Sequence, residues 1–365
     1  MRVIILGAGA SKAAGYPLAS ELMPAIDVEM SGSHVMDRKQ WSDWVEYRES
    51  ASGHLRMVLA CPNPEVTLSL LDLYEHTLAA HDDAEMSRRL AAWGAAPDLP
   101  VDDSYYELPE RDELHRGVVA RARLLACLYS YFGFRHYDDS THRPRRDYLR
   151  GLLASLQPGD VVVTFNWDTT VERTLAEEAL WSPFNGYGFE KVLVLRSPIE
   201  ESSELPSGLP MRSPITVLKL HGSFGWQYAN DGNIIFDHRY YLNHFDFWWN
   251  GNRLPLIDPL APRVGPPRDY ALEHPTFLKR IRGGAMQEIW HRATTALSNA
   301  STVEVWGYSL PASDIGPRVL LNGLRFRLDG GSVDVHVHVG PDGESQRRWR
   351  EFLGERATID DRKLE

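Results

Sequence analysis

Four short motifs carry the residue types suited to binding or cleaving a ligand, and they are spread along the whole chain. They are Gly7-Ala8-Gly9-Ala10-Ser11, Thr164-Phe165-Asn166-Trp167-Asp168, Lys219-Leu220-His221-Gly222-Ser223 and Trp306-Gly307-Tyr308-Ser309. Each follows or ends an apolar run typical of a buried strand. In open α/β sheets, ligands bind outside the carboxyl ends of the strands. The four motifs are therefore placed where polar groups would meet such a ligand.

The first motif is a small-residue loop. Its glycines and alanines let the backbone approach a phosphate and present N–H groups to it. The strict dinucleotide fingerprint fails, because Lys12 occupies the position of the third glycine. A plain tight turn is the alternative interpretation of this motif.

The second and third motifs hold the candidate chemical groups. Asn166 and Asp168 follow a buried strand, and Asp168 would also suit the start of a helix near Thr169. His221 is followed by a glycine that leaves room beside its ring, and a histidine near its reference pKa accepts protons at neutral pH. A purely structural histidine is the alternative, and the fourth motif could be an ordinary turn after a strand.

The elements that must position these motifs follow from hydrophobic periodicity. Strands are predicted at 3–6, 160–165, 191–195, 215–220, 303–308 and 333–339, and helices at 18–30, 65–78, 113–133, 168–180 and 284–299. This order predicts an α/β fold: a single domain over 1–365, with a Rossmann-like, doubly wound and mostly parallel sheet. Residues 31–150 form a mostly helical insertion in this interpretation, and 224–300 an irregular, aromatic-rich segment followed by a helix.

Composition narrows the functional classes. The 365 residues are 43% hydrophobic, and the net charge of −11 argues against attraction of the whole surface to nucleic acid. The only cysteines are Cys61 and Cys127, which excludes a zinc site built from four cysteines. No signal peptide or membrane span is expected, so we expect a cytoplasmic protein.

Taken together and in this order, the motifs resemble those of the SIR2 (sirtuin) superfamily. Its members carry a Gly-Ala-Gly-x-Ser…Gly-x-Pro loop, an Asn-x-Asp motif, a His-Gly motif and a later Gly-[Thr/Ser]-Ser strand end. The resemblance covers residues 1–30 and 155–340 and leaves out the insertion. It implies an NAD-binding fold of the SIR2 type.

The resemblance also implies roles for individual positions. Asn166 would hold the ribose of NAD and a water near its anomeric carbon, Asp168 would bind the nicotinamide carboxamide, and His221 would be the general base acting on the ribose hydroxyls. The remaining NAD-binding positions would be Gly7, Ala8, Gly9, Ala10 and Ser11 at the phosphates, Gly15 and Pro17 toward the nicotinamide, Tyr308 and Ser309 along the adenosine half, and Thr164, Gly222 and Gly307 in the same site.

One departure from the protein deacylases of this superfamily shapes the functional expectation. Deacylases place a four-cysteine zinc ribbon after the His-Gly motif, whereas residues 224–300 contain no cysteine, so neither zinc nor another metal is expected. The chain looks like the bacterial SIR2-like NADases of anti-phage defence. We therefore expect hydrolysis of NAD to nicotinamide and ADP-ribose, in a homo-oligomer, with a regulatory partner protein, or both.

Two other functions stay open at this point. One is NAD-dependent transfer to protein, by deacylation or ADP-ribosylation. The other is a non-catalytic module that binds NAD or an ADP-ribose derivative as a sensor.

Two further sequence features have structural alternatives. His336 and His338 share one face of a strand with Asp334 and could hold a metal, but the preferred interpretation is the polar face of a half-buried edge strand. The aromatic run 245–249 is interpreted as core, a lid over the NAD pocket or an oligomer interface.

Overall fold

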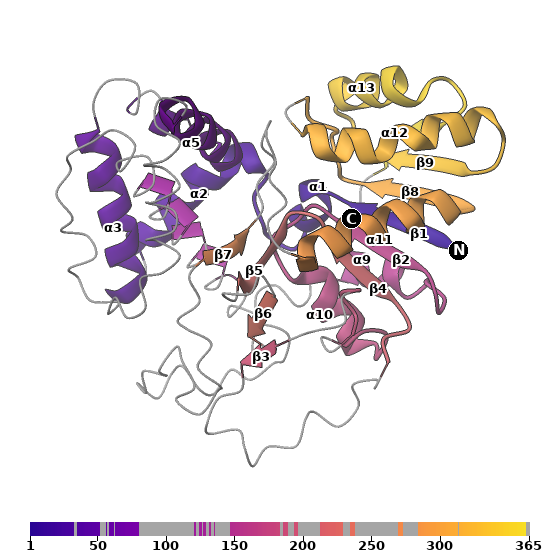
Figure 1. The fold of residues 1–365 in the computed structure, drawn as a ribbon, viewed down its shortest axis with the longest axis horizontal. Coiled ribbons are helices and arrows are strands. Elements are labelled where there is room, and N and C mark those ends of the chain that lie inside the picture. Colours follow the sequence, from indigo (N-terminus) through magenta and orange to yellow (C-terminus); the bar gives the residue numbers. More distant parts are fainter. Residues whose placement is uncertain are drawn as a thin grey trace, which may run out of the picture.

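A six-stranded sheet forms the centre of this computed structural model, and every pairing within the sheet is parallel (Figure 1). Its strands are β1 (Arg2–Leu6), β2 (Val161–Thr164), β4 (Thr216–Lys219), β8 (Thr302–Trp306), β9 (Asp334–His338) and β10 (Thr358–Asp360). They lie in the order β10-β9-β8-β1-β2-β4. Renumbered among themselves and read from β4, they give 3-2-1-4-5-6, the order of doubly wound, Rossmann-like folds.

The structure describes most of this core and part of the remaining chain. The described residues are 1–32, 35–51, 56, 58–61, 63–79, 120–121, 124–125, 127–128, 131–132, 135, 147–182, 185–188, 193–195, 212–228, 234–237, 269–272, 284–312 and 314–362. The aromatic run at 245–249 and residues 80–119 of the predicted insertion lie outside them.

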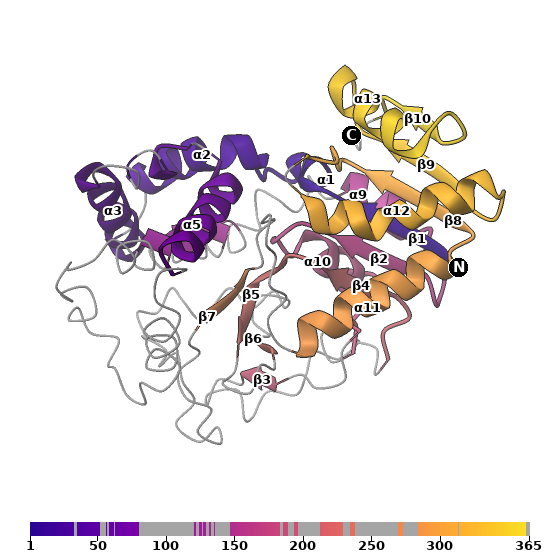
Figure 2. The same ribbon diagram turned by 45° about the horizontal axis from the view of Figure 1, so that its top comes forward.

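Helices cover both faces of the sheet (Figure 2). Helices α9 (Asp147–Leu153) and α10 (Thr170–Glu177) contact each other on one face. On the other face, α12 (Ile315–Asp329) contacts both α11 (Gly284–Asn299) and α13 (Gly343–Leu353). The predicted α/β class, with a mostly parallel sheet and flanking helices, is confirmed.

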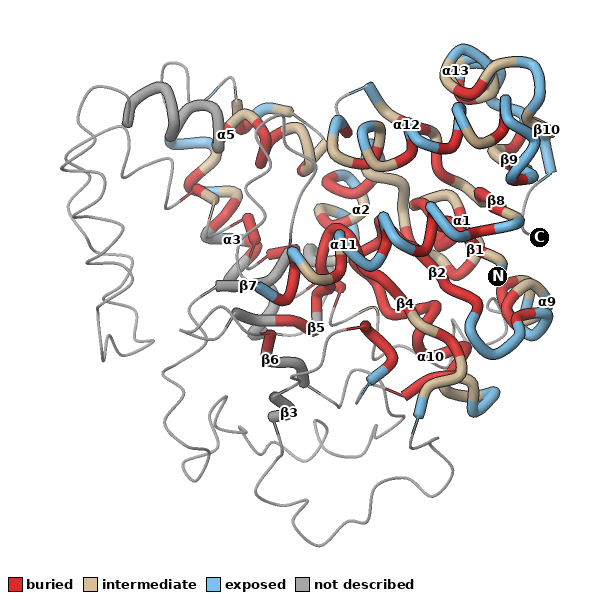
Figure 3. Tube along the Cα trace, turned by 45° about the vertical axis from the view of Figure 1, so that its right-hand side comes forward, coloured by how far each residue is buried: buried red, intermediate tan, exposed pale blue. Residues whose placement is uncertain are grey.

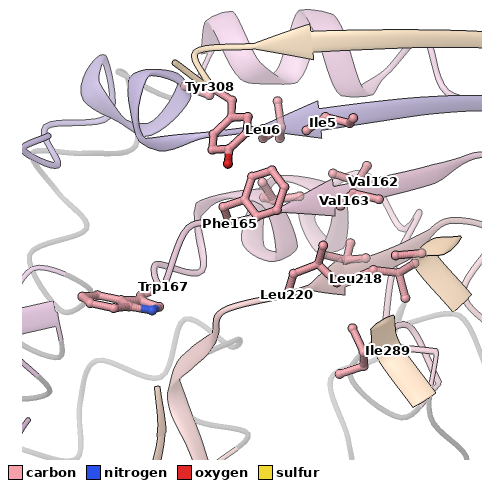
Figure 4. Close-up of a cluster of buried hydrophobic side chains, with 14 of the residues drawn as sticks. Ile5, Leu6, Val162, Val163, Phe165, Trp167, Leu218, Leu220, Ile289 and Tyr308 are labelled. Atoms are coloured by element: carbon pink, nitrogen blue, oxygen red, sulfur yellow. The ribbon is translucent and has the colours of Figure 1, made fainter. Parts of the chain in front are cut away.

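Burial explains why the central strands were readable as continuous apolar runs. Every residue of β2 is buried, as are all residues of β1 except the first, because both faces of these strands are covered (Figure 3). Strand β8 instead alternates buried and half-buried residues. Figure 4 shows the core formed where Ile5, Leu6, Val162, Val163 and Leu218 meet.

A second, smaller sheet lies beside the first (Figure 1). Its strands are β3 (Leu193–Leu195), β5 (Gly222–Tyr228), β6 (Ile234–Asp237) and β7 (Asp269–Leu272), in the order β3-β6-β5-β7. The sequence predicted an irregular segment where β5, β6 and β7 lie. These strands are short, and their aromatic and polar residues do not alternate cleanly, so no period-2 pattern reveals them.

The N-terminal helices gather away from α12 and α13 (Figure 1). After the five-residue α1 (Ala8–Lys12) come α2 (Ala19–Gly32), α3 (Val35–Ser50) and α5 (Pro64–Ala79). Helix α3 falls in a polar span of the predicted helical insertion, for which no individual helix was delimited. Trp41 and Trp44, both buried, anchor it to the core. In the described part of the chain, no helix combines the length and apolar character needed to cross a bilayer.

The interpretation of Asp334–His338 as an edge strand is wrong. Strand β9 pairs with β8 on one side and with β10 on the other, so it is an interior strand. His338 is buried at 3% exposure, and its Nδ1 lies 2.6 Å from Asp360 Oδ1. Strand β10 was missed because it has only three residues in a charged C-terminal stretch.

Glycines at the ends of β1 and β8 bring two loops into backbone contact. A Cβ on Gly7 would lie 2.5 Å from Tyr308 Cα, and a Cβ on Gly9 2.9 Å from Gly307 Cα. Gly307 has a φ of +64°, and its Cβ would meet Ala10 N at 2.3 Å. Real Cβ atoms do not approach backbone this closely, so these positions require glycine.

Replacing Gly307 by alanine should therefore destabilise the fold by about 2–4 kcal/mol, from positive-φ strain plus overpacking. The measurement is urea unfolding followed by circular dichroism. Gly323→Ala is the matched control, since Gly323 lies within α12 with open space around its Cβ position. The control should stabilise by about 0.5–1 kcal/mol. Equal unfolding midpoints for Gly307→Ala and wild type would contradict the close contact.

Candidate active site

The carboxyl ends of β1, β2, β4 and β8 bring the four predicted motifs to one edge of the sheet. These strands are neighbours in the order β8-β1-β2-β4. The order reverses between β1 and β8, and in open α/β sheets such a switch point forms the ligand crevice. The sheet topology therefore brings the motifs together, although residues 12–163 separate the first two in the sequence.

The side chain of Asn166 joins the end of β2 to the loop after β1. Its Nδ2 donates to Gly7 O at 2.9 Å and to Ser11 Oγ at 2.8 Å. Its backbone N–H donates to Thr164 Oγ1 at 3.1 Å. Asn166 is only 8% exposed, so these bonds fix its amide in one orientation.

The small-residue loop contacts protein more than open space. Gly7 N donates to Trp306 O, Gly9 N to Gly307 O and Ala10 N to Gly7 O, at 2.9–3.0 Å. The missing side chains of its glycines make room for the β8 loop, as described above. Ala8 and Gly9 are its half-buried members, so a ligand would reach the loop there.

Asp168 takes the helix-start role that the sequence left open as an alternative. Its Oδ1 accepts the N–H of Thr170, the first residue of α10, at 2.9 Å. The side chain is 4% exposed. Thus one carboxylate oxygen of Asp168 is used inside the protein.

His221 is buried at the end of β4 beside aromatic rings from two other motifs. The centroid of its ring lies 5.3 Å from that of Phe165, and the Phe165 and Tyr308 ring centroids lie 4.2 Å apart. Figure 4 shows Phe165 beside Tyr308. The next residue, Gly222, has a φ of +72°, and Ser223 Oγ donates to Trp167 O at 3.2 Å. The loops after β2, β4 and β8 are thus packed against one another.

A buried ion pair lies beneath these loops. Lys219 Nζ lies 3.0 Å from Glu172 Oε1 and also donates to the carbonyl of Asp168, and both charged side chains are fully buried. Tyr187 donates its hydroxyl to the same Glu172 oxygen at 3.0 Å. Burial raises the pKa of Glu172, and the Lys219 ammonium opposes that rise. The pair ties the start of α10 to the end of β4, two residues before His221.

The structure adds a carboxylate that the sequence analysis missed. Asp314 Oδ2 accepts the hydroxyl of Tyr308 at 2.7 Å, and its Oδ1 lies 3.5 Å from His221 Nε2. Burial, followed by the charge of Asp314, raises the pKa of Tyr308 well above its usual value. In the sequence, Asp314 precedes a helical stretch and has the pattern of an ordinary helix cap.

The insertion also contributes to the site. The Phe132 ring stacks on Tyr16 and Phe224, with centroid distances of 5.9 and 6.2 Å, and meets Trp167 edge-on at 6.0 Å. Arg135 Nη1 donates to Gly15 O at 3.3 Å. Phe132 and Arg135 therefore pack against the segment after α1, the loop after β2 and strand β5.

Two further predicted binding residues follow α1 and β8. Pro17 and Ser309 are half-buried, and Ser309 O accepts from Arg348 Nε at 3.1 Å. Among the described residues, no group of three or more His, Cys, Asp and Glu side chains could hold a metal ion. Compared with known proteins, the sequence matches no family model and no curated protein.

Breaking the buried pair should be costly. We expect Lys219→Met and Glu172→Gln each to destabilise by about 3–5 kcal/mol, because each leaves an uncompensated buried group. The double variant should cost less than the sum of the two, by about 1–3 kcal/mol. Urea unfolding of all four proteins measures this coupling.

The exposed pair Arg347–Glu351, at 3.8 Å, is the control, and Glu351→Gln should change stability by less than about 0.5 kcal/mol. Strictly additive effects of Lys219→Met and Glu172→Gln would show that their side chains do not interact.

Proposed function

We propose that the protein is a SIR2-type NAD hydrolase, which cleaves the nicotinamide–ribose bond of NAD to release nicotinamide and ADP-ribose. The observation that carries the proposal is the pair of bonds from the Asn166 amide to Gly7 O and Ser11 Oγ. They join the Asn-x-Asp motif to the Gly-Ala-Gly-x-Ser motif. A buried histidine from the third motif stands at the same edge of the sheet.

The reaction needs little covalent chemistry from the protein. Nicotinamide leaves from a cationic pyridinium as a neutral molecule, so its departure needs no acid. The transition state is oxocarbenium-like, as in glycoside cleavage, and positioning and preorganised dipoles supply most of the catalysis. Water adds to the anomeric carbon, and its proton is released.

The contacts of the side chains support a mechanism in which the protein mainly positions the ribose and the attacking water. Both N–H bonds of the Asn166 amide are used within the protein, so its Oδ1 is the atom that would hold the ribose or the attacking water. His221, at the end of β4, would accept a proton from a ribose hydroxyl. Asp168 keeps its second carboxylate oxygen for the carboxamide, and the phosphates would lie against Ala8 and Gly9.

The biological setting is part of the same proposal. The absence of cysteine from residues 224–300 favours hydrolysis over deacylation, because the zinc ribbon of the deacylases is not encoded there. Its resemblance to defence NADases favours a role in NAD depletion during phage infection. Such an activity would be controlled by oligomerisation or by a partner protein.

The test is nicotinamide release from NAD by the purified protein over a series of protein concentrations. Asn166→Ala and His221→Ala should each lower release by about 10²-fold or more. Asn322→Ala and His291→Ala, at exposed positions on α12 and α11, are the matched controls and should keep full activity.

The outcomes separate the alternatives. Release that depends steeply on protein concentration would indicate activation by assembly. If wild type binds NAD but releases no nicotinamide at any concentration, hydrolysis by this protein alone is contradicted, and an NAD-binding sensor becomes the better description.

A further inference from the structure

Asp314 occupies a position at which an aspartate side chain commonly caps a helix. Asp314 is the N-cap residue of α12, yet its side chain makes no capping hydrogen bond. Asp342, the N-cap residue of α13, accepts the N–H groups of Glu344 and Ser345 at 3.1 and 3.3 Å. Because a capping aspartate stabilises its helix, a carboxylate turned away from its helix calls for another explanation.

The carboxylate of Asp314 is instead directed into the site. One oxygen accepts from Tyr308 and the other faces His221 Nε2 at 3.5 Å. The side chains of His221 and Asp314 are each 3% exposed. Tyr308 supplies a hydrogen bond of the kind that a buried carboxylate needs, and the contact with His221 is of ion-pair length.

Tyr308 remains a hydrogen-bond donor to the Asp314 carboxylate. Its raised pKa, caused by burial and by Asp314, keeps the phenol protonated at neutral pH. A hydrogen bond from a neutral donor favours the ionised form of the carboxylate. Trp349 Nε1 donates to Tyr308 O at 2.8 Å and helps to hold this residue in place.

We propose that Asp314 is a positioning residue for His221, which keeps a proton on Nε2, leaves Nδ1 as the basic atom and stabilises the imidazolium. The inference rests on the proposed function, in which His221 accepts a proton. That proton moves from a ribose hydroxyl to Nδ1, the Nε2 proton stays in place, and the positive charge forms beside the carboxylate. The Nδ1 proton returns to the ribose oxygen once water has added to the anomeric carbon, and the net proton released comes from that water. The 3.5 Å contact would shorten once the ring is charged.

The most direct test is the pKa of His221, measured by NMR titration of protein labelled with ¹⁵N-histidine and free of NAD. The chain has 14 histidines, so the His221 signal is assigned by its loss in His221→Gln. Asp314→Asn removes the charge and keeps the shape. It should lower the pKa of His221 by about 1 unit or more. Asp342→Asn, at the other N-cap, should leave this pKa unchanged.

The other charged groups near Tyr308 and His221 are the same in wild type and in Asp314→Asn. Glu65 and Arg318 both act on Tyr308, and Lys219 and Glu172 form their own pair. If the pKa of His221 does not fall in Asp314→Asn, the inference is overturned. Should Asp314→Asn fail to fold, Tyr308→Phe serves instead. Without the Tyr308 hydroxyl, Asp314 loses a competing donor and interacts more strongly with His221, so the pKa of His221 should rise. An unchanged or lowered pKa of His221 would overturn the inference.

Kinetics provide the second readout. Asp314→Asn should lower kcat for nicotinamide release by roughly 10²-fold with little change in KM, because the imidazolium forms only in the transition state. Asp314→Glu should recover part of the loss. The pKa measurement does not depend on NAD cleavage, so its failure contradicts the role of Asp314, whereas an inactive wild type contradicts the proposed function alone.

Discussion

Backbone contact between the loops after β1 and β8 is the constraint on which the site depends. Gly7, Gly9 and Gly307 allow these loops to approach at distances that no Cβ would permit. Two consequences follow from this one contact. The Gly7 carbonyl is placed where the Asn166 amide binds it, and Tyr308 is placed against Phe165. The residues that follow β1, β2 and β8 are thereby held in fixed positions relative to one another.

The buried ion pair of Lys219 and Glu172 is a second constraint on the geometry of the site. Lys219 and Glu172 pay a large desolvation cost, which is offset by their contact, by the Asp168 carbonyl and by Tyr187. Hydrophobic residues of similar volume would fill the same space but would not fix the orientation of α10 relative to β4. The pair fixes how the loop after β2 lies relative to β4, the strand that precedes His221. Asp314 is a second buried carboxylate in this region, held by the Tyr308 hydroxyl and lying 3.5 Å from His221 Nε2.

Local signals in the sequence were enough to predict the parallel core. Continuous apolar runs marked β1, β2 and β4, and small or polar residues directly after them marked the strand ends. Elements without such signals were missed. Strand β10 has three residues, and α3 lies in a polar span whose anchors are the two isolated tryptophans, Trp41 and Trp44.

The site was predictable in part for a similar reason. Asn166 and His221 follow strands, and their types suggest chemistry. Asp314 looks like a helix cap in sequence, and only the direction of its side chain reveals another role. The glycines of the first loop were interpreted as allowing a phosphate to approach the backbone, and that role stays a prediction. In the structure, the side on which a Cβ of Gly7 or Gly9 would stand is occupied by the backbone of the β8 loop. Contacts between segments 300 residues apart leave no local pattern.

The central claim is that the four strand-end motifs form one NAD site. A crystal structure of His221→Ala soaked with NAD tests it most directly, because slow cleavage in this variant would preserve the substrate. The account predicts the nicotinamide ribose beside Asn166 Oδ1 and the pyrophosphate against Ala8 and Gly9. NAD bound at another place, or crystals of folded protein that bind none at saturating concentration, would contradict it.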